Sequence, residues 1–168
     1  MVPLIKPAAW MIDKRAVDVA FVLDGERHPV AIGRHGGTLR PLETPAPAAY
    51  TESGGATVEV PLIRLAWARS GDKGNLSNIG LIARQPSFLP LLWKRVTPEV
   101  VKGYFAHLVE GEVERYHLPG IDAINYLLHD ALDGGGMASR RIDPLGKGMA
   151  QMLLDLKIAV PIEIAAAA

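Results

Sequence analysis

The chain has 168 residues, of which 49% are hydrophobic and 21% charged, so it can bury the core of one domain with a small appendage. Its 18 basic residues balance 18 acidic ones, which argues against a dedicated nucleic-acid-binding protein. It contains no cysteine, which excludes disulfides, thiolate zinc sites and cysteine-held iron–sulfur clusters.

The start of the chain does not read as a targeting segment. Pro3 and Pro7 interrupt its apolar residues, and charged residues follow by Asp13. No run approaches the roughly 18 apolar residues of a membrane span. We therefore expect a cytoplasmic protein that has no membrane partner.

The first 40 residues predict a pair of strands. Residues 17–23 are mostly apolar, residues 24–25 are the turn signal Asp-Gly, and residues 26–33 resume a strand pattern. Pro29 suits the edge of such a β-hairpin, because proline has no N–H to donate to a neighbouring strand.

A change of composition then separates two regions. Residues 41–56 are rich in proline, alanine and glycine and have no hydrophobic period, which predicts a linker. Residues 57–164 are denser in apolar residues, which predicts the main domain.

Strands and helices alternate in the main domain. The helix at 97–111 has the clearest boundary, with Thr97 as the N-cap, Pro98 at the first position and Glu99 in the first turn. The order predicts an α+β sandwich, an antiparallel or mixed sheet with helices on one face. Strands are expected at 57–67, 78–83, 112–118, 138–143 and 157–164, and helices at 97–111, 120–132 and 148–156, with a short helical piece at 87–96 interrupted by Pro90.

The segment 68–78, ARSGDKGNLSN, concentrates small and polar residues between two predicted strands. Positive φ angles at Gly71 and Gly74 would turn backbone N–H groups toward one point, where Lys73 adds a positive charge. We therefore expect an anion-binding loop at 69–78. Its candidate ligand contacts are Arg69, Ser70, Gly71, Gly74, Asn75, Ser77 and Asn78.

The same segment also has a purely structural interpretation. Asp72 and Asn75 are typical of a hairpin turn in which their side chains bond to the local backbone. A minimal hairpin turn needs only about two residues, so the length of the polar stretch favours binding. The segment is not a P-loop, because the spacing to Lys73 differs and a strand follows.

A second glycine cluster, DGGGMASRRID, offers Arg140 and Arg141 as further anion contacts if the fold brings it beside the first. Its alternative interpretation is a helix C-cap followed by an edge strand with solvated arginines. The histidines form no i, i+4 pair, so no metal site is predicted. A triad of Ser70, His129 and Asp72 lacks a nucleophile elbow to support it.

Two long segments carry a family resemblance. RLAWARSGDKGNLSNIGLIAR and VKGYFAHLVEGEVERYHLPGIDAINYLLHDALDGGGMASRRIDPLGKGMAQMLLDLKI resemble, with their spacing, the C-terminal ferredoxin-like domain of AtuA-type proteins, the acyclic terpene utilisation family. The likeness covers about residues 57–160 and implies a βαββαβ topology. Members of the family carry a larger N-terminal domain before a linker of alanine and proline, and residues 1–40 resemble only its last stretch.

The resemblance implies a role in the catabolism of acyclic terpenes through branched acyl-CoA esters. We expect a small subunit or fragment that acts as an accessory or interface module, docks on a larger AtuA-like domain or subunit, or forms homo- or hetero-oligomers. No cofactor is implied, although CoA esters are candidate ligands. The alternative is a subunit of an acyl-CoA hydratase or lyase, with Asp72 as acid or base and with Lys73 and Arg69 binding the anion.

Overall fold

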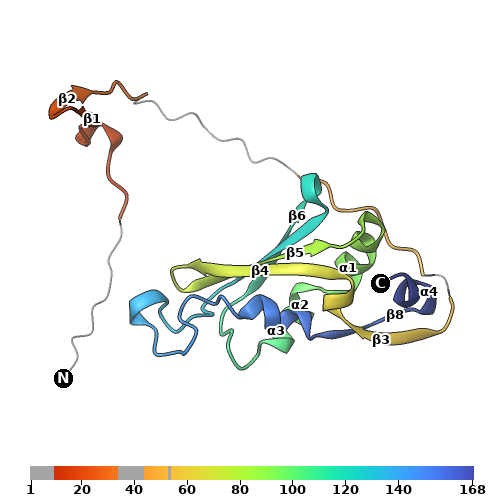
Figure 1. Cartoon of the computed structure of the whole chain (residues 1–168). Helices are drawn as coiled ribbons and strands as arrows, with labels where there is room; N and C mark the ends of the chain where they lie inside the picture. The colour runs from red at the N-terminus through yellow and green to blue at the C-terminus, as the bar shows by residue number, and fades with distance from the viewer. Residues whose placement is uncertain (1–9, 34–43, 53) are drawn as a thin grey trace. The chain divides into compact units, whose positions relative to one another are not determined.

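The computed structural model describes residues 10–33, 44–52 and 54–168, and the chain divides into one compact unit within residues 7–43 and another from residue 44 to the C-terminus (Figure 1). Residues 44–52 contain no helix or strand. The predicted linker also includes residues 41–43 and 53, which lie outside the described residues. The domain boundaries at 40 and 56 therefore stay a prediction.

The N-terminal unit contains the predicted hairpin. A 3-10 turn, η1 (Lys14–Ala16), precedes strands β1 (Ala20–Leu23) and β2 (Glu26–Pro29), which pair antiparallel. Asp24 and Gly25 form the turn with φ angles of 51° and 84°. None of the described residues of this unit is buried.

The larger unit is built on a four-stranded antiparallel sheet with the strand order β4-β5-β7-β6. A separate antiparallel pair joins β3 near its start to β8 near its end. The strands are β3 (Thr57–Pro61), β4 (Ala66–Lys73), β5 (Leu76–Ala83), β6 (Val113–Leu118), β7 (Ala123–Leu128) and β8 (Lys157–Pro161).

Helices cover one face of this sheet, which confirms the predicted α+β ferredoxin-like class (Figure 1). The implied βαββαβ order is not found, because β4 and β5 pair as one hairpin and β6 and β7 as another, with α1 and α2 between the two hairpins. Helix α3 packs on β4 and β5, and α2 packs on β6. The helices are α1 (Leu89–Arg95), α2 (Pro98–Tyr104), α3 (Met149–Leu154) and α4 (Ile162–Ala167), and the 3-10 turns are η2 (Leu62–Arg64), η3 (Pro86–Phe88), η4 (Pro119–Ile121) and η5 (Gly136–Ala138).

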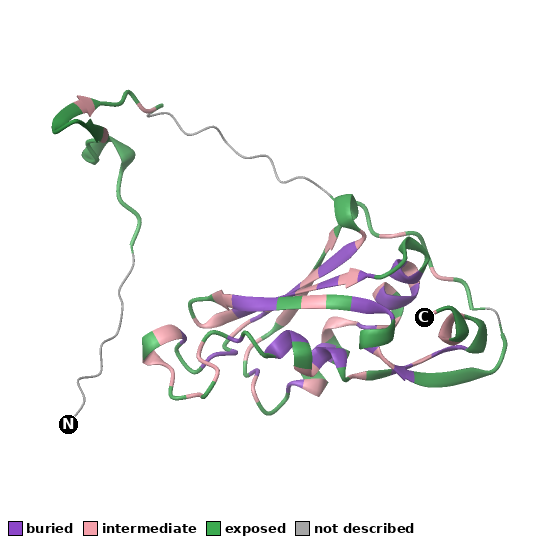
Figure 2. Cartoon of the chain, viewed as in Figure 1, coloured by how far each residue is buried: buried purple, intermediate pink, exposed green. Residues whose placement is uncertain are grey.

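The alternation of side chains gives the sheet two different faces. Along β5, Ser77, Ile79, Leu81 and Ala83 are buried, whereas the residues between them are half-buried. We call these the covered face and the open face. In Figure 2, buried residues alternate with half-buried or exposed residues along parts of the strands. Because successive side chains of a strand point to opposite faces, the register of β4, β6 and β7 assigns their residues to the same two faces.

Polar side chains tie the covered face to the end of α1. The Tyr126 hydroxyl is buried and donates a 2.7 Å hydrogen bond to the Val96 carbonyl. Burial raises the pKa of Tyr126 well above that of an exposed tyrosine. The Arg115 guanidinium lies 3.9 Å over the Trp93 ring and donates to the Trp93 carbonyl.

The prediction of one strand over residues 57–67 was wrong. The segment forms β3 and then η2 before β4 begins, and β3 and β4 lie in different sheets. Pro61 is the last residue of β3, and the change in hydrophobic phase there marks the exit from one sheet toward the other.

The predicted helix over residues 120–132 was also wrong, because β7 occupies its centre. This strand is bonded on both sides, to β5 and to β6, and its buried residues Ile124, Tyr126 and Leu128 alternate. A short apolar run fits either a helix or a buried strand, and the two neighbouring strands decide for the strand.

Other boundaries differ in detail. Residues 138–143 form no strand: Ala138 ends η5, and residues 139–143 have no regular structure. Pro90 lies in the first turn of α1, where a missing N–H costs nothing, and does not interrupt the helix. Thr97 caps α2 as predicted, accepting a bond from the Val100 N–H, but α2 ends at Tyr104.

Candidate functional site

The polar segment 69–78 is a hairpin and not a loop. Strand β4 continues to Lys73 and β5 begins at Leu76, so that Gly74 and Asn75 alone form the turn. Gly74 has a positive φ of 69°, as a tight hairpin turn requires, whereas Gly71 lies within β4 and has no positive φ. The two glycines therefore do not form the predicted nest of N–H groups, because strand pairing extends through the polar residues.

Strand alternation separates the polar side chains of the hairpin. The register places Ser70, Asp72 and Ser77 on the covered face. The remaining candidates Arg69, Lys73 and Asn78 lie on the open face, where Arg69 and Lys73 are exposed. The candidate residues thus do not converge on one point.

The two serines act as buried tethers. The Ser70 hydroxyl donates to the Lys147 carbonyl at 3.1 Å and accepts from the Ala150 N–H at 2.9 Å, which fixes the start of α3 against β4. The Ser77 hydroxyl donates to the Gly71 carbonyl at 3.4 Å. Both hydroxyls are buried and bond to backbone groups, so the roles of the two serines are structural.

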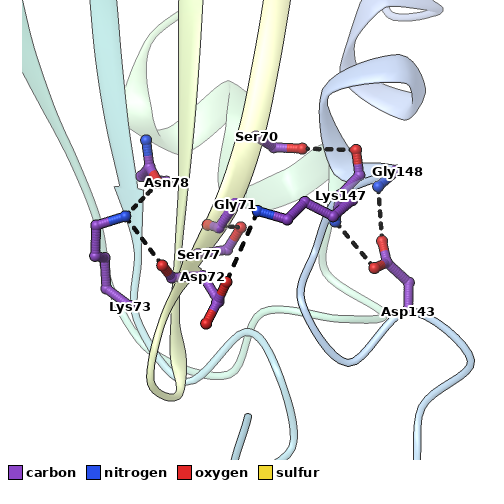
Figure 3. Close-up of polar contacts among 9 residues, drawn as sticks. All are labelled: Ser70, Gly71, Asp72, Lys73, Ser77, Asn78, Asp143, Lys147 and Gly148. Carbon is purple, nitrogen blue, oxygen red and sulfur yellow. Dashed lines mark hydrogen bonds and ion pairs between the residues drawn. The ribbon is translucent and has the colours of Figure 1, made fainter. Parts of the chain in front are cut away.

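A turn before α3 presents a lysine that the sequence analysis missed. The Asp143 carboxylate accepts from the Lys147 N–H at 2.9 Å and from the Gly148 N–H at 2.7 Å (Figure 3). Aspartate commonly stabilises turns in this way. The motif Asp-Pro-Leu-Gly-Lys-Gly at 143–148 was the available signal, since it joins a turn-forming aspartate to a lysine between glycines.

Lys147 extends to the edge strand β4 (Figure 3). Its ammonium nitrogen lies 3.8 Å from Asp72 Oδ1, and a Cβ added at Gly71 would stand only 2.8 Å from that nitrogen. The absence of a side chain at Gly71 is therefore what admits the lysine. The Asp72 carboxylate is thus paired with Lys147, which comes from a distant segment, and not with its neighbour Lys73.

Lys73 brings a second ammonium group to the same stretch of β4. Its nitrogen donates to the Asp72 carbonyl at 3.0 Å and to Asn78 Oδ1 at 3.5 Å (Figure 3). Asn78 Nδ2 in turn donates to Asn125 Oδ1 at 3.3 Å, toward the middle of the open face. We call Lys73 and Lys147 the lysine pair. Of the two, Lys147 contacts a carboxylate, that of Asp72, whereas Lys73 bonds to neutral oxygens.

The second glycine cluster does lie beside the hairpin turn. Asn75 Oδ1 accepts from the Gly134 N–H at 2.8 Å, and Asn75 Nδ2 donates to Asp130 at 2.9 Å. A Cβ at Gly135 would stand 2.0 Å from the Gly74 carbonyl oxygen, so only glycine fits there. Asn75 is thus a structural link between the two clusters.

The two arginines of that cluster have other contacts. The Arg141 guanidinium donates to the Leu108 carbonyl at 2.9 Å and to the Ala131 carbonyl. Arg140 lies 3.7 Å from the Asp133 carboxylate. These hydrogen bonds and this ion pair are with segments outside the β4–β5 hairpin.

A further polar group lies on β6 and directly after β7. Glu114 Oε1 is 2.6 Å from His129 Nε2, and the Tyr116 hydroxyl donates to the same carboxylate. The bond from Tyr116 and then that from His129 hold the pKa of Glu114 below its usual range, and the bond to Glu114 raises the pKa of Tyr116. His129 is therefore paired with Glu114 and not with Ser70 or Asp72.

Residues 10–33, 44–52 and 54–168 contain neither a metal-binding cluster nor a membrane-spanning helix. No group of three or more His, Asp and Glu side chains there is placed to hold a metal ion. No helix in these ranges is long and apolar enough to cross a membrane.

Comparison with protein families identifies the larger unit. Residues 60–159 match the family model of the AtuA ferredoxin-like domain, which covers the sheet from the end of β3 to β8 and both elements that carry the lysine pair. No curated protein and no solved structure matches the chain.

Proposed function

Because the chain belongs to the AtuA ferredoxin-like domain family, we propose that it is an accessory module of acyclic terpene and branched acyl-CoA catabolism. The module docks on a larger AtuA-type partner and contributes an anion-binding site to the interface. The observation that carries this proposal is the lysine pair at β4. A cytoplasmic location and assembly into a homo- or hetero-oligomer are parts of the same proposal.

The lysine pair supports the anion site. The Lys147 ammonium is paired with the Asp72 carboxylate, whereas the Lys73 ammonium bonds to two neutral oxygens, the Asp72 carbonyl and Asn78 Oδ1, so the lysine pair keeps a net positive charge. The Lys147 side chain is 56% exposed, and a ligand can therefore reach it. Lysine binds phosphate as a compact, hydrated charge, and the phosphates of CoA offer it several anionic oxygens.

The open face supports docking. Its register aligns Trp67, Ile82, Ala123 and Leu118 in one apolar row across the four strands. Trp67 is 51% exposed, and the Arg84 guanidinium lies 4.8 Å over its ring. Aromatic residues and arginine are enriched in protein interfaces, so this row is a suitable contact surface, at the opposite end of β4 from Lys73.

One observation favours the alternative, a subunit of an acyl-CoA hydratase or lyase. The Asp72 side chain is 34% exposed and lies next to Lys147, so a carboxylate is available to a ligand bound by the lysine pair. Asp72 would then transfer a proton while Lys73 and Lys147 hold the acyl-CoA, and Arg69 lies three residues earlier on the open face of the same strand.

A thermal-shift titration tests the anion site. Isovaleryl-CoA should raise the melting temperature of the full chain in a concentration-dependent way, and CoA alone should do so too, because the site recognises the phosphates. Lys73→Ala and Lys147→Ala should each abolish the shift. Lys102→Ala, which removes an exposed lysine of α2, is the matched control and should keep it.

The outcomes separate the candidates. A shift that persists in both lysine variants would place the ligand elsewhere and reject the site. Turnover of an unsaturated branched acyl-CoA by the chain with its larger partner, lost in Asp72→Asn while the thermal shift is kept, would favour the enzyme subunit over the accessory module.

A further inference from the structure

A concave site whose lining includes neither residue of the lysine pair has a different chemistry. It is a pocket of about 430 Å³, a size typical of small-molecule sites. Its walls come from the segment after α2, the segment after β7, residues 140–143 and α3. Aliphatic and thioether side chains form most of the lining: Leu108, Leu132, Ile142, Met149 and Met152.

Arg141 brings a positive charge to this apolar pocket. It is half-buried, and its guanidinium donates to the carbonyls of Leu108 and Ala131. These neutral acceptors orient the guanidinium but do not neutralise it. Within the part of the chain that the structure describes, Arg141 forms no ion pair with a carboxylate.

The other charged groups of the lining leave the pocket with a net positive charge, because the guanidinium groups of Arg140 and Arg141 face a single carboxylate in the lining, that of Asp143. The Asp143 carboxylate is engaged by the N–H groups of Lys147 and Gly148. Arg140 adds a second guanidinium, whose side chain is 89% exposed and lies 3.7 Å from Asp133 outside the lining. His107, also in the lining, adds no negative charge at any pH.

We propose that this pocket binds an aliphatic carboxylate, with the hydrocarbon chain among Leu132, Met149 and Met152 and the carboxylate on Arg141. An apolar cavity beside a half-buried guanidinium favours a ligand that is apolar along its length and anionic at one end. Flexible methionine side chains adapt to branched as well as straight chains. The lysine pair contributes no residue to this lining, so the inference does not rest on the proposed function.

Isothermal titration calorimetry of the full chain with decanoate tests the proposal. Decanoate should bind, and decan-1-ol should bind on the order of tenfold more weakly, because the alcohol loses the charge-assisted bonds to the guanidinium. Met152→Trp should abolish binding of both by filling the pocket. Lys73→Ala should bind decanoate like the wild type, so a failure here is separable from a failure of the lysine site.

Two substitutions of Ile142 with opposite charges test the proposal at an exposed position, where they should not unfold the protein. Its side chain lines the pocket and is fully exposed, at 104%. Ile142→Asp should weaken decanoate binding several-fold by charge repulsion, whereas Ile142→Lys should keep or tighten it, with melting temperatures near that of the wild type. The absence of binding by the wild type, or equal decanoate affinities in the two Ile142 variants, would overturn the proposal.

Discussion

The two faces of the β4–β5 hairpin carry similar polar residues and use them differently. On the covered face Ser70 is buried and bonded to the backbone before α3. On the open face Lys73 is exposed and bonds to Asn78 beside a second lysine. One short segment thus contains tethers and candidate ligand contacts in alternation, and composition alone does not tell them apart.

The largest expected effect contrasts two neighbours on β5. Leu81 is fully buried on the covered face, whereas Ile82 is half-buried on the open face. Leu81→Ala should lower the free energy of unfolding by about 2–5 kcal/mol, because it removes packed methyl groups and leaves a cavity. Ile82→Ala should cost clearly less. Urea denaturation measures both, and equal losses would contradict the assignment of the faces.

The next largest effect on stability is expected from removing the buried hydroxyl of Ser70. Ser70→Ala should lower the free energy of unfolding by about 1–3 kcal/mol, because the Ala150 N–H loses its acceptor. Ser87→Ala, at an exposed serine of η3, should change stability by less than about 0.5 kcal/mol. If Ser70→Ala proved as mild as the control, the serine would not be a tether of α3.

Gly71 tests the contact between β4 and Lys147. The added Cβ of Gly71→Ala would meet only the flexible end of Lys147, so the free energy of unfolding should change by less than about 1 kcal/mol. Displacing the ammonium should nevertheless weaken CoA binding, measured by calorimetry. Gly103→Ala in α2, where a Cβ meets nothing within 4 Å, is the control with unchanged binding.

The smallest effect is a dependence on pH. The folded state lowers the pKa of Glu114, chiefly through the bond from Tyr116, so the ionised carboxylate adds stability above the usual glutamate pKa. That stability is lost as the pH falls through the lowered value. Glu114→Gln should therefore flatten the acid side of the stability profile. Glu112→Gln, at an exposed residue before β6, should leave the profile unchanged.

Sequence analysis predicted features that depend on neighbouring residues. The Asp24-Gly25 turn predicted the first hairpin, and Thr97 with Pro98 predicted the start of α2. It failed where partners are distant. The polar stretch was interpreted as a loop because strand pairing between β4 and β5 is not visible in composition.

For the candidate site, the sequence identified several of the residues but not which of them contact one another. Lys73 and Asn78 were named, and the structure places them in contact. Lys147 was missed because its relation to Asp72 spans distant segments, which only the packing of α3 on β4 brings together. Arg140 and Arg141 were named for the hairpin but line a different pocket.

The sequence by itself determined the family, the fold class and the elements whose signals are local, since caps and turn residues act through bonds to their immediate neighbours. The tertiary structure decided that residues 123–128 are a strand, because β5 and β6 supply hydrogen-bond partners on both sides. It also decided which polar side chains face water and which lysine reaches Gly71, because sheet register and helix packing bring together groups that no sequence window contains.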